Sequence, residues 1–229
     1  MAMAKKNAPA QQENLGFDSV EQTLTKTEQF LENNAKQVGI AVGTVVALVL
    51  AFFAYNTYLV APKVAEAGTE MAKAIKWFET DSMDLALNGN GANYGFLDII
   101  EEYSSTPAGN SAHYYAGIAY YSLGDFQSAI QELDSYRASN TATGAMALGV
   151  IGDAFVELGQ MDDAADYYQK AAKSTDNSFT TPFFLWKAGL ALEANGEASK
   201  AVKLYETIAR DYPESRQAAG IEAVIAALK

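Results

Sequence analysis

The chain has 229 residues, of which 49% are hydrophobic and 19% charged, so it can bury one sizeable core and is not disordered as a whole. Its formal charge is −12, which disfavours nucleic acid as a partner because neutralising phosphates requires clustered Lys and Arg. The sequence contains no cysteine, which excludes thiol nucleophiles, disulfides and Cys-ligated metals and leaves the redox compartment open.

The first 36 residues are predicted to form a tail and a short helix. Residues 1–17 are rich in Ala, Gln and Asn and are expected to be a flexible tail. Residues 18–36 begin with "DSVEQ", which has the pattern of a capping box, and are expected to form an amphipathic juxtamembrane helix. Its apolar side chains share one face: Phe17, Val20, Leu24 and Leu31. This helix could lie on the lipid headgroups, pack against a partner, or continue into a membrane span.

The most apolar segment covers residues 37–62 and carries no charge. A helix needs about 20 apolar residues to cross the hydrocarbon core of a bilayer, so a transmembrane anchor is predicted here. A cleaved signal peptide is the main alternative, but its apolar region has only about 7–15 residues and lies close to the N-terminus. Pro62 is expected to end or kink the helix where it leaves the membrane.

Small residues recur at every fourth position of this segment: Gly39, Gly43, Ala47 and Ala51. Together they form a stripe on one helix face, which would permit the close approach of another membrane helix. Small residues are also common in membrane helices generally, so the sequence names no partner for this face. The lysines on the two sides do not fix the orientation of the anchor, because neither flank has a clear excess.

Residues 63–109 are predicted to form a degenerate repeat of two helices. Apolar periodicity covers residues 64–80 and 94–103, and these stretches are joined by "DSMDLALNGNGAN". The "NGNG" within this connection superficially resembles a phosphate-binding loop. No lysine follows it and no strand precedes it, so a turn is expected.

Residues 110–229 contain one pattern three times, in units spaced by 35 and 37 residues. Each unit has a glycine, a second glycine seven positions later, an alanine after that, and a large residue sixteen positions after the first glycine. The aligned sets are Gly117, Gly152 and Gly189; Gly124, Gly159 and Gly196; Ala129, Ala164 and Ala201; and Leu133, Tyr168 and Tyr205. The spacing is close to the ~34 residues of a tetratricopeptide repeat.

This pattern resembles the consensus of the tetratricopeptide repeat family in all three units. The first glycine would let two helices approach closely, and the second would end the first helix of each pair at a tight turn. The chain departs from the consensus where His113, Leu148 and Leu185 replace a tryptophan. The predicted fold class is therefore all-α: a single N-terminal transmembrane helix followed by an α-solenoid with three clear repeats, one degenerate repeat and a C-terminal capping helix over residues 216–228.

No residue set in the sequence suggests catalysis, a metal or a cofactor. His113 is the only histidine and falls at a helix-packing position, which favours a role in the core over acid–base catalysis. Asp162, Asp163 and Asp166 coincide with the start of a helix, where acidic side chains complement the helix dipole. The chain is predicted not to be an enzyme and to take neither a cofactor nor a small-molecule substrate.

In the family that the repeats resemble, the first helices line a concave groove that binds other proteins. The groove positions carried onto this chain give an aromatic and acidic set: Ser111, Tyr114, Ile118, Tyr121, Met146, Gly149, Asp153, Glu157, Phe183, Trp186, Leu190 and Glu193. The lysine and asparagine clamp with which some members hold a C-terminal carboxylate is absent, so an apolar or weakly basic extended segment is expected instead. Alternatively, neighbouring repeats could bury several of these side chains.

The order of tail, anchor and repeats over residues 20–229 resembles the bacterial YfgM-like tetratricopeptide proteins, and segments such as "YPES" are similar to their Bacteroidetes-type members. The resemblance implies a single-pass inner-membrane protein with a cytoplasmic N-terminus and periplasmic repeats. Its implied partners are the SecYEG translocon, secreted chains and periplasmic chaperones, with the lipid bilayer around its anchor. A structural scaffold of another envelope assembly or secretion complex is the alternative function.

Overall fold

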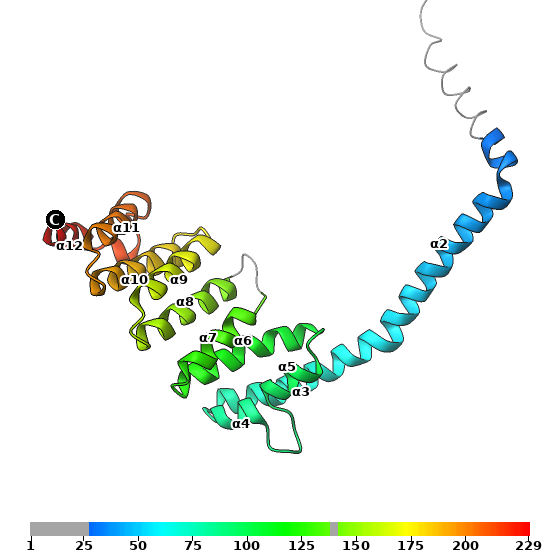
Figure 1. The fold of residues 1–229 in the computed structure, drawn as a ribbon, viewed down its shortest axis with the longest axis horizontal. Helices are drawn as coiled ribbons and strands as arrows, with labels where there is room; N and C mark the ends of the chain where they lie inside the picture. The colour runs from blue at the N-terminus through cyan, green and yellow to red at the C-terminus, as the bar shows by residue number, and fades with distance from the viewer. Residues whose placement is uncertain (1–27, 138–141) are drawn as a thin grey trace, which may run out of the picture. The chain divides into compact units, whose positions relative to one another are not determined.

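The computed structural model describes residues 28–137 and 142–229, and all regular structure within these residues is helical (Figure 1). The predicted tail, residues 1–17, and the first part of the predicted juxtamembrane helix lie outside the described residues. Residues 28–33 are helical and lead through a turn at Asn34 into the next helix. The all-α fold class is thus confirmed.

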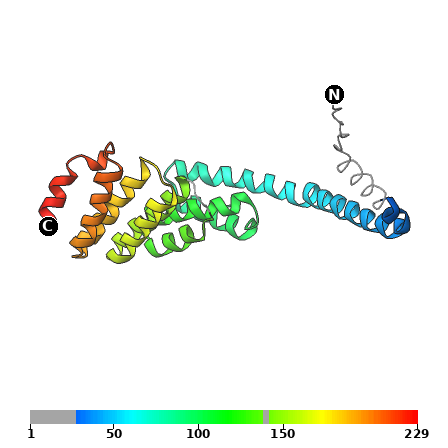
Figure 2. The same ribbon diagram turned by 90° about the horizontal axis from the view of Figure 1, so that it is seen from above.

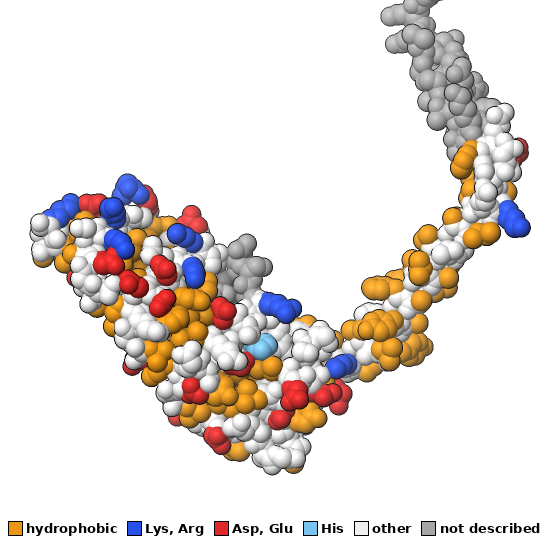
Figure 3. All heavy atoms as spheres, viewed as in Figure 1, with side chains coloured by type: hydrophobic (Ala, Val, Ile, Leu, Met, Phe, Trp, Pro, Cys, Tyr) orange, Lys and Arg blue, Asp and Glu red, His pale blue; other side chains and the backbone are white. Residues whose placement is uncertain are grey.

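The chain divides into two units, Met1–Leu59 and Val60–Lys229. The first contains helix α2 (Ala35–Tyr55), in which no residue is buried. Hydrophobic side chains cover α2 along its length in Figure 3. A helix that is apolar on all sides and also exposed suits a lipid environment better than water. By length and composition, the helical stretch that begins with α2 is able to cross a membrane.

Pro62 does not end this helical stretch, contrary to one of the two expectations for it. The π-helical turn η1 (Asn56–Val60) follows α2, and Pro62 lies in the first turn of α3 (Ala61–Glu79). Proline lacks an N–H and clashes with the carbonyl four residues earlier in a regular α-helix. The wider π turn directly before Pro62 accommodates that clash, so the helical backbone continues.

The degenerate repeat has one more helix than the two predicted. Between α3 and α5 (Phe96–Glu102), the connecting segment forms the short helix α4 (Met83–Asn88). Ala86 and Leu87 of α4 are buried in the same hydrophobic cluster as Phe96. The connection becomes helical because Ala86 and Leu87 bury apolar surface there, whereas Leu85 stays exposed.

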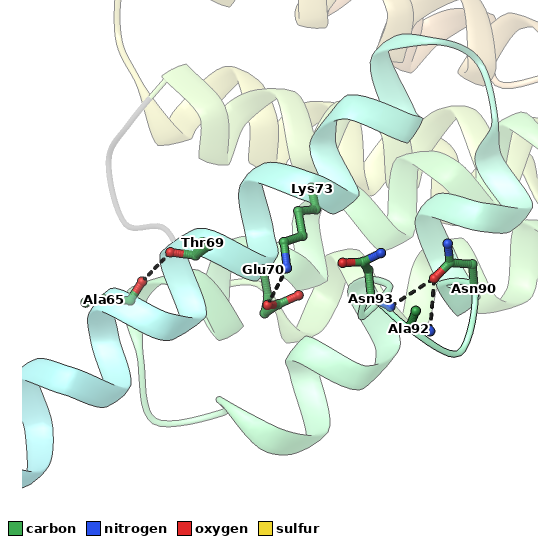
Figure 4. A network of polar contacts seen from close by, with 7 residues as sticks. All are labelled: Ala65, Thr69, Glu70, Lys73, Asn90, Ala92 and Asn93. Atoms are coloured by element: carbon green, nitrogen blue, oxygen red, sulfur yellow. Dashed lines mark hydrogen bonds and ion pairs between the residues drawn. The ribbon is translucent and has the colours of Figure 1, made fainter.

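The "NGNG" segment forms a turn, as predicted. Asn90 Oδ1 accepts hydrogen bonds from the backbone N–H groups of Ala92 and Asn93 at 3.1 and 2.9 Å (Figure 4). Gly89 and Gly91 have positive φ angles, a conformation that glycine adopts without strain. Side-chain capping of its own turn is a structural role for Asn90, with no ligand needed to explain it.

Three helix pairs follow, and each helix packs against the next one along the chain (Figure 2). The pairs are α6 (Pro107–Ser122) with α7 (Phe126–Ser135), α8 (Ala142–Glu157) with α9 (Met161–Ser174), and α10 (Thr180–Ala194) with α11 (Ala198–Asp211). These are the three predicted repeats. Their buried side chains form clusters that join neighbouring pairs, so each pair covers apolar surface of the next.

The repeat glycines have the roles predicted for them. A Cβ on Gly152 would lie 2.7 Å from Tyr168 Cδ1, and one on Gly189 would lie 2.3 Å from Tyr205 Cε1, so only glycine lets these helices approach so closely. The second glycines directly follow the first helices in the left-handed conformation: Gly124, Gly159 and Gly196, with φ of 83°, 73° and 77°. The three aligned alanines are completely buried.

The C-terminal cap is two short helices and not the single helix predicted over 216–228. A 3₁₀ turn, η2 (Arg216–Ala218), precedes α12 (Ile221–Leu228), and Gly220 between them has a φ of 78°. Ile221 and Ile225 of α12 are buried against the last repeat. The segment therefore covers the end of the solenoid as expected, with a break where glycine permits a reversal.

Candidate protein-binding groove

All of the predicted groove residues lie on α6, α8 and α10, the first helices of the three repeats. Those on α8 and α10 include well-exposed apolar side chains: Leu190, Met146 and Phe183 are 47%, 45% and 39% exposed. The exposure of such large apolar side chains in one row costs free energy unless a partner covers them. Their role in binding stays a prediction.

The predicted groove residues of α6 are less accessible to a binding partner. Tyr114, Ile118 and Tyr121 are half-buried and pack against a hydrophobic cluster that α7 and α8 form between the first and second repeats. The Tyr114 ring lies 5.3 Å from that of Tyr136, centroid to centroid. On α8, Gly149 is buried against Phe184 of α10. A Cβ at Gly149 would lie 2.3 Å from Phe184 Cε1. Burial by neighbouring elements, the alternative for these positions, therefore applies to much of α6 and to Gly149.

A hollow of about 670 Å³ opens beside the N-terminal halves of α8 and α10. Its apolar walls are Met146, Phe179, Phe183 and Trp186. Its opposite side is the segment around η2: Glu214, Ser215, Arg216, Gln217 and Ala219. Phe179, the residue directly before α10, is 81% exposed although its side chain is large and apolar. Three of these four walls were predicted groove residues. Phe179 was missed because it precedes the helix from which the groove positions are counted.

Asp153, in the middle of the groove, has two partners. Lys187 Nζ of the next repeat lies 2.5 Å from Asp153 Oδ1, and the Tyr168 hydroxyl donates a hydrogen bond to the same oxygen. The Lys187 ammonium also lies 5.0 Å from the centre of the Tyr168 ring. Burial, and then the hydrogen bond to Asp153, raise the pKa of Tyr168 above its usual range. The charge of Asp153 is thus compensated within the protein.

Lys187 was not predicted as a groove residue. It directly follows Trp186, which was, and it stands 34 residues after Asp153, about one repeat length. In the register of these repeats Asp153 is equivalent to Leu190, so Lys187 lies about one helical turn before the equivalent position on the adjacent first helix. Opposite charges about one repeat apart were the available signal.

The far end of the groove is acidic. Glu157 and Glu193 lie at the C-terminal ends of α8 and α10, and no ion pair joins either one to a cation among the described residues. Glu193 accepts a hydrogen bond from the Tyr205 hydroxyl. Burial, and then the nearby carboxylates of Asp153 and Glu157, raise the pKa of Tyr121. Two helix C-termini add their own negative potential at this end.

Within residues 28–137 and 142–229, no three His, Asp or Glu side chains cluster as metal ligands would. The prediction that His113 belongs to the core is only partly met. Its imidazole is 22% exposed, and its Nδ1 lies 2.8 Å from Oε2 of Glu132 on α7. Asp162 and Asp163 lie in the first turn of α9, as expected, and Asp162 accepts a hydrogen bond from Asn195 at 2.7 Å.

The small-residue stripe on α2 is open. Gly39, Gly43, Ala47 and Ala51 are exposed, and a Cβ added at either glycine would meet nothing within 4 Å. The contact predicted for this face stays a prediction.

Stacked helix pairs with an exposed apolar and acidic groove define a helical repeat scaffold for binding other proteins. Comparison with known families agrees: residues 96–143 and 114–179 match one tetratricopeptide repeat family, and residues 184–215 match a second. The chain belongs to the tetratricopeptide repeat proteins, whose repeats typically serve as non-enzymatic interaction domains. No curated protein matches it.

Proposed function

We propose that this chain is a membrane-anchored, non-enzymatic module that holds a segment of another protein in the groove of its repeats. The observation that carries the proposal is the groove itself. It combines an apolar hollow, whose Phe179 wall is 81% exposed, with carboxylates at Glu157 and Glu193 that lack a cation partner among the described residues. Apolar side chains beside unpaired charges on a rigid repeat surface are typical of a site completed by a partner.

The finer proposal concerns the partner and the compartment. The chain would sit in a bacterial inner membrane through α2, with its N-terminus in the cytoplasm and its repeats in the periplasm. It would accompany the SecYEG translocon and pass secreted chains to periplasmic chaperones. The order of anchor and repeats supports this proposal, as does the open small-residue stripe on α2, which suits contact with another membrane helix.

The test is purification of the full-length protein from native membranes in mild detergent, with bound proteins identified by mass spectrometry. A Gly43→Ile, Ala47→Ile variant blocks the stripe, and a Val45→Ile, Val49→Ile variant adds bulk to the opposite face of the same helix as a control. We expect SecYEG with the unmodified protein and the control but not with the stripe variant. Recovery of another envelope complex in place of SecYEG would refute the translocon proposal and favour the scaffold alternative.

A further inference from the structure

We infer that the groove recognises an extended peptide segment in which a large apolar side chain is followed or preceded, four or five residues away, by a lysine or arginine. The inference rests on the proposed function, because it names the chemistry of the segment held by the same groove. It follows from the distribution of apolar surface and charge along α8 and α10.

The apolar side chain of the segment would enter the hollow at the N-terminal ends of these helices. A volume of about 670 Å³ exceeds that of any single side chain, and Met146, Phe183 and Trp186 supply flexible and aromatic walls. Lys187 Nζ lies 5.5 Å from the centre of the Phe183 ring, so a cation stands beside this aromatic wall. A phenylalanine, tryptophan or leucine of the segment would bury its own surface and that of Phe179 together.

The cation of the segment would lie at the opposite, C-terminal ends of the same helices. Glu157 is exposed, and Glu193 accepts a hydrogen bond from the neutral Tyr205 hydroxyl, so neither carboxylate is paired with a cation among the described residues and both have lone pairs to offer. The helix C-termini strengthen the attraction for a positive group. In the middle of the groove, Lys187 already compensates Asp153, so the attraction for a cation is concentrated at the far end.

The helix geometry sets the spacing between the two contact points of the peptide, the apolar hollow and the pair Glu157 and Glu193. An α-helix rises 1.5 Å per residue, so Met146 and Glu157 are separated by about 16 Å along α8, and Phe183 and Glu193 by about 15 Å along α10. An extended chain advances about 3.3 Å per residue. Four or five residues of such a chain therefore span the distance from the hollow to the two carboxylates.

The experiment measures the binding of synthetic peptides to the full-length protein in detergent by fluorescence anisotropy. Each peptide is acetylated, amidated and otherwise built from Gly and Ser, with one Trp and one Lys placed two to eight positions apart in both orders. We expect the tightest binding at a separation of four or five. Replacing the Lys with Gln at that separation should weaken binding about two- to fivefold, as for an exposed ion pair. Replacing the Trp with Ser should weaken it about tenfold or more.

Variants of the protein test the two contact points of the peptide independently. Glu157→Gln with Glu193→Gln should remove the advantage of Lys over Gln in the peptide while keeping an acceptor for Tyr205. Glu101→Gln with Glu102→Gln makes the same charge change on α5, outside the groove, and should leave that advantage intact. Lys187→Met exposes the charge of Asp153 about 10 Å from Met146, so it should add a second binding optimum near a separation of three.

Equal affinity at all separations, or equal loss of the Lys advantage in the groove and α5 variants, would overturn the inference. Either result would leave the proposed function standing if the membrane purification still recovers SecYEG. Conversely, the predicted spacing dependence without recovery of SecYEG would uphold the peptide chemistry and remove the translocon as the partner.

Discussion

Substitution of Gly189 by alanine tests the packing between the two helices of the last repeat. A Cβ at this position would lie 2.3, 2.5 and 2.8 Å from Tyr205 Cε1, Cζ and Oη. The Tyr205 ring cannot easily move away. It is fully buried, its hydroxyl donates to Glu193, and the Trp186 ring packs 5.1 Å from it, centroid to centroid.

The magnitude follows from two opposing effects. Carbon atoms in contact prefer separations of about 3.5–4.0 Å, and adding a methyl group to a packed core usually costs about 1–3 kcal/mol. With two ring carbons and the hydroxyl oxygen inside 3.0 Å we expect the upper end, about 3 kcal/mol. Alanine is favoured over glycine within a helix by about 1 kcal/mol, so the net loss is about 2 kcal/mol. For a chain of this size that lowers Tm by about 4–8 °C.

The assay is thermal unfolding of the full-length protein in detergent, followed by circular dichroism. Gly68→Ala is the matched control, because Gly68 lies in α3 and an added Cβ meets nothing within 4 Å. This control gains helix propensity without the clash and should raise Tm by about 2–4 °C. Should Gly189→Ala melt at or above the unmodified protein, the assigned repeat register and its close helix approach would be wrong.

Four other predictions concern the second repeat, its ion pair with the third repeat, and the turn at Asn90. Ala164→Trp should cost at least about 1–3 kcal/mol by thermal unfolding, because Ala164 is completely buried; unchanged melting would contradict the packing. The pKa of Tyr168 is higher in the folded than in the unfolded chain, so as the pH rises the unfolded chain loses the hydroxyl proton first. The free energy of unfolding should therefore decline above about pH 10. Tyr168→Phe should reduce that decline in unfolding curves measured at alkaline pH. Lys187→Met should cost under about 1 kcal/mol, with Asp153→Asn added to it recovering part of the loss in a double-mutant cycle. Asn90→Ala removes two turn hydrogen bonds and should cost about 1–2 kcal/mol, measurable by the same unfolding assay.

The repeats could be predicted from the sequence because each of their key positions has one dominant physical requirement. Gly152 and Gly189 admit an aromatic ring where any Cβ would collide, and Gly159 adopts a φ of 73° that other residues rarely tolerate. Such requirements recur at a fixed spacing and are visible without a structure. The helix α4 had no such signal, because it depends on how a short apolar segment packs against its neighbours. Gly220 adopts a φ of 78° like Gly159, but it lies outside the repeated pattern, so the break there was not predicted.

The groove was harder to predict than the fold because exposure depends on the neighbouring repeat. Tyr114 and Met146 were both assigned to the groove by repeat position, yet Tyr114 packs on the cluster between the first and second repeats while Met146 is 45% exposed. Lys187 and Phe179 lie beside the predicted positions and change the chemistry of the site, one by compensating Asp153 and the other by walling the hollow. Repeat position identifies the helix face, and the side chains of adjacent repeats decide what remains open to a partner.

The same two repeats pack through one face of α8 and α10 and present the proposed groove on another. Gly152 and Gly189 face the second helices of their own repeats, where Tyr168 and Tyr205 fill the gap and donate to Asp153 and Glu193. These hydrogen bonds hold carboxylates of the groove in place from behind. Loss of either tyrosine hydroxyl should thus weaken the binding of a basic segment and also lower stability. Loss of the Phe179 side chain should weaken binding alone, because that side chain is 81% exposed.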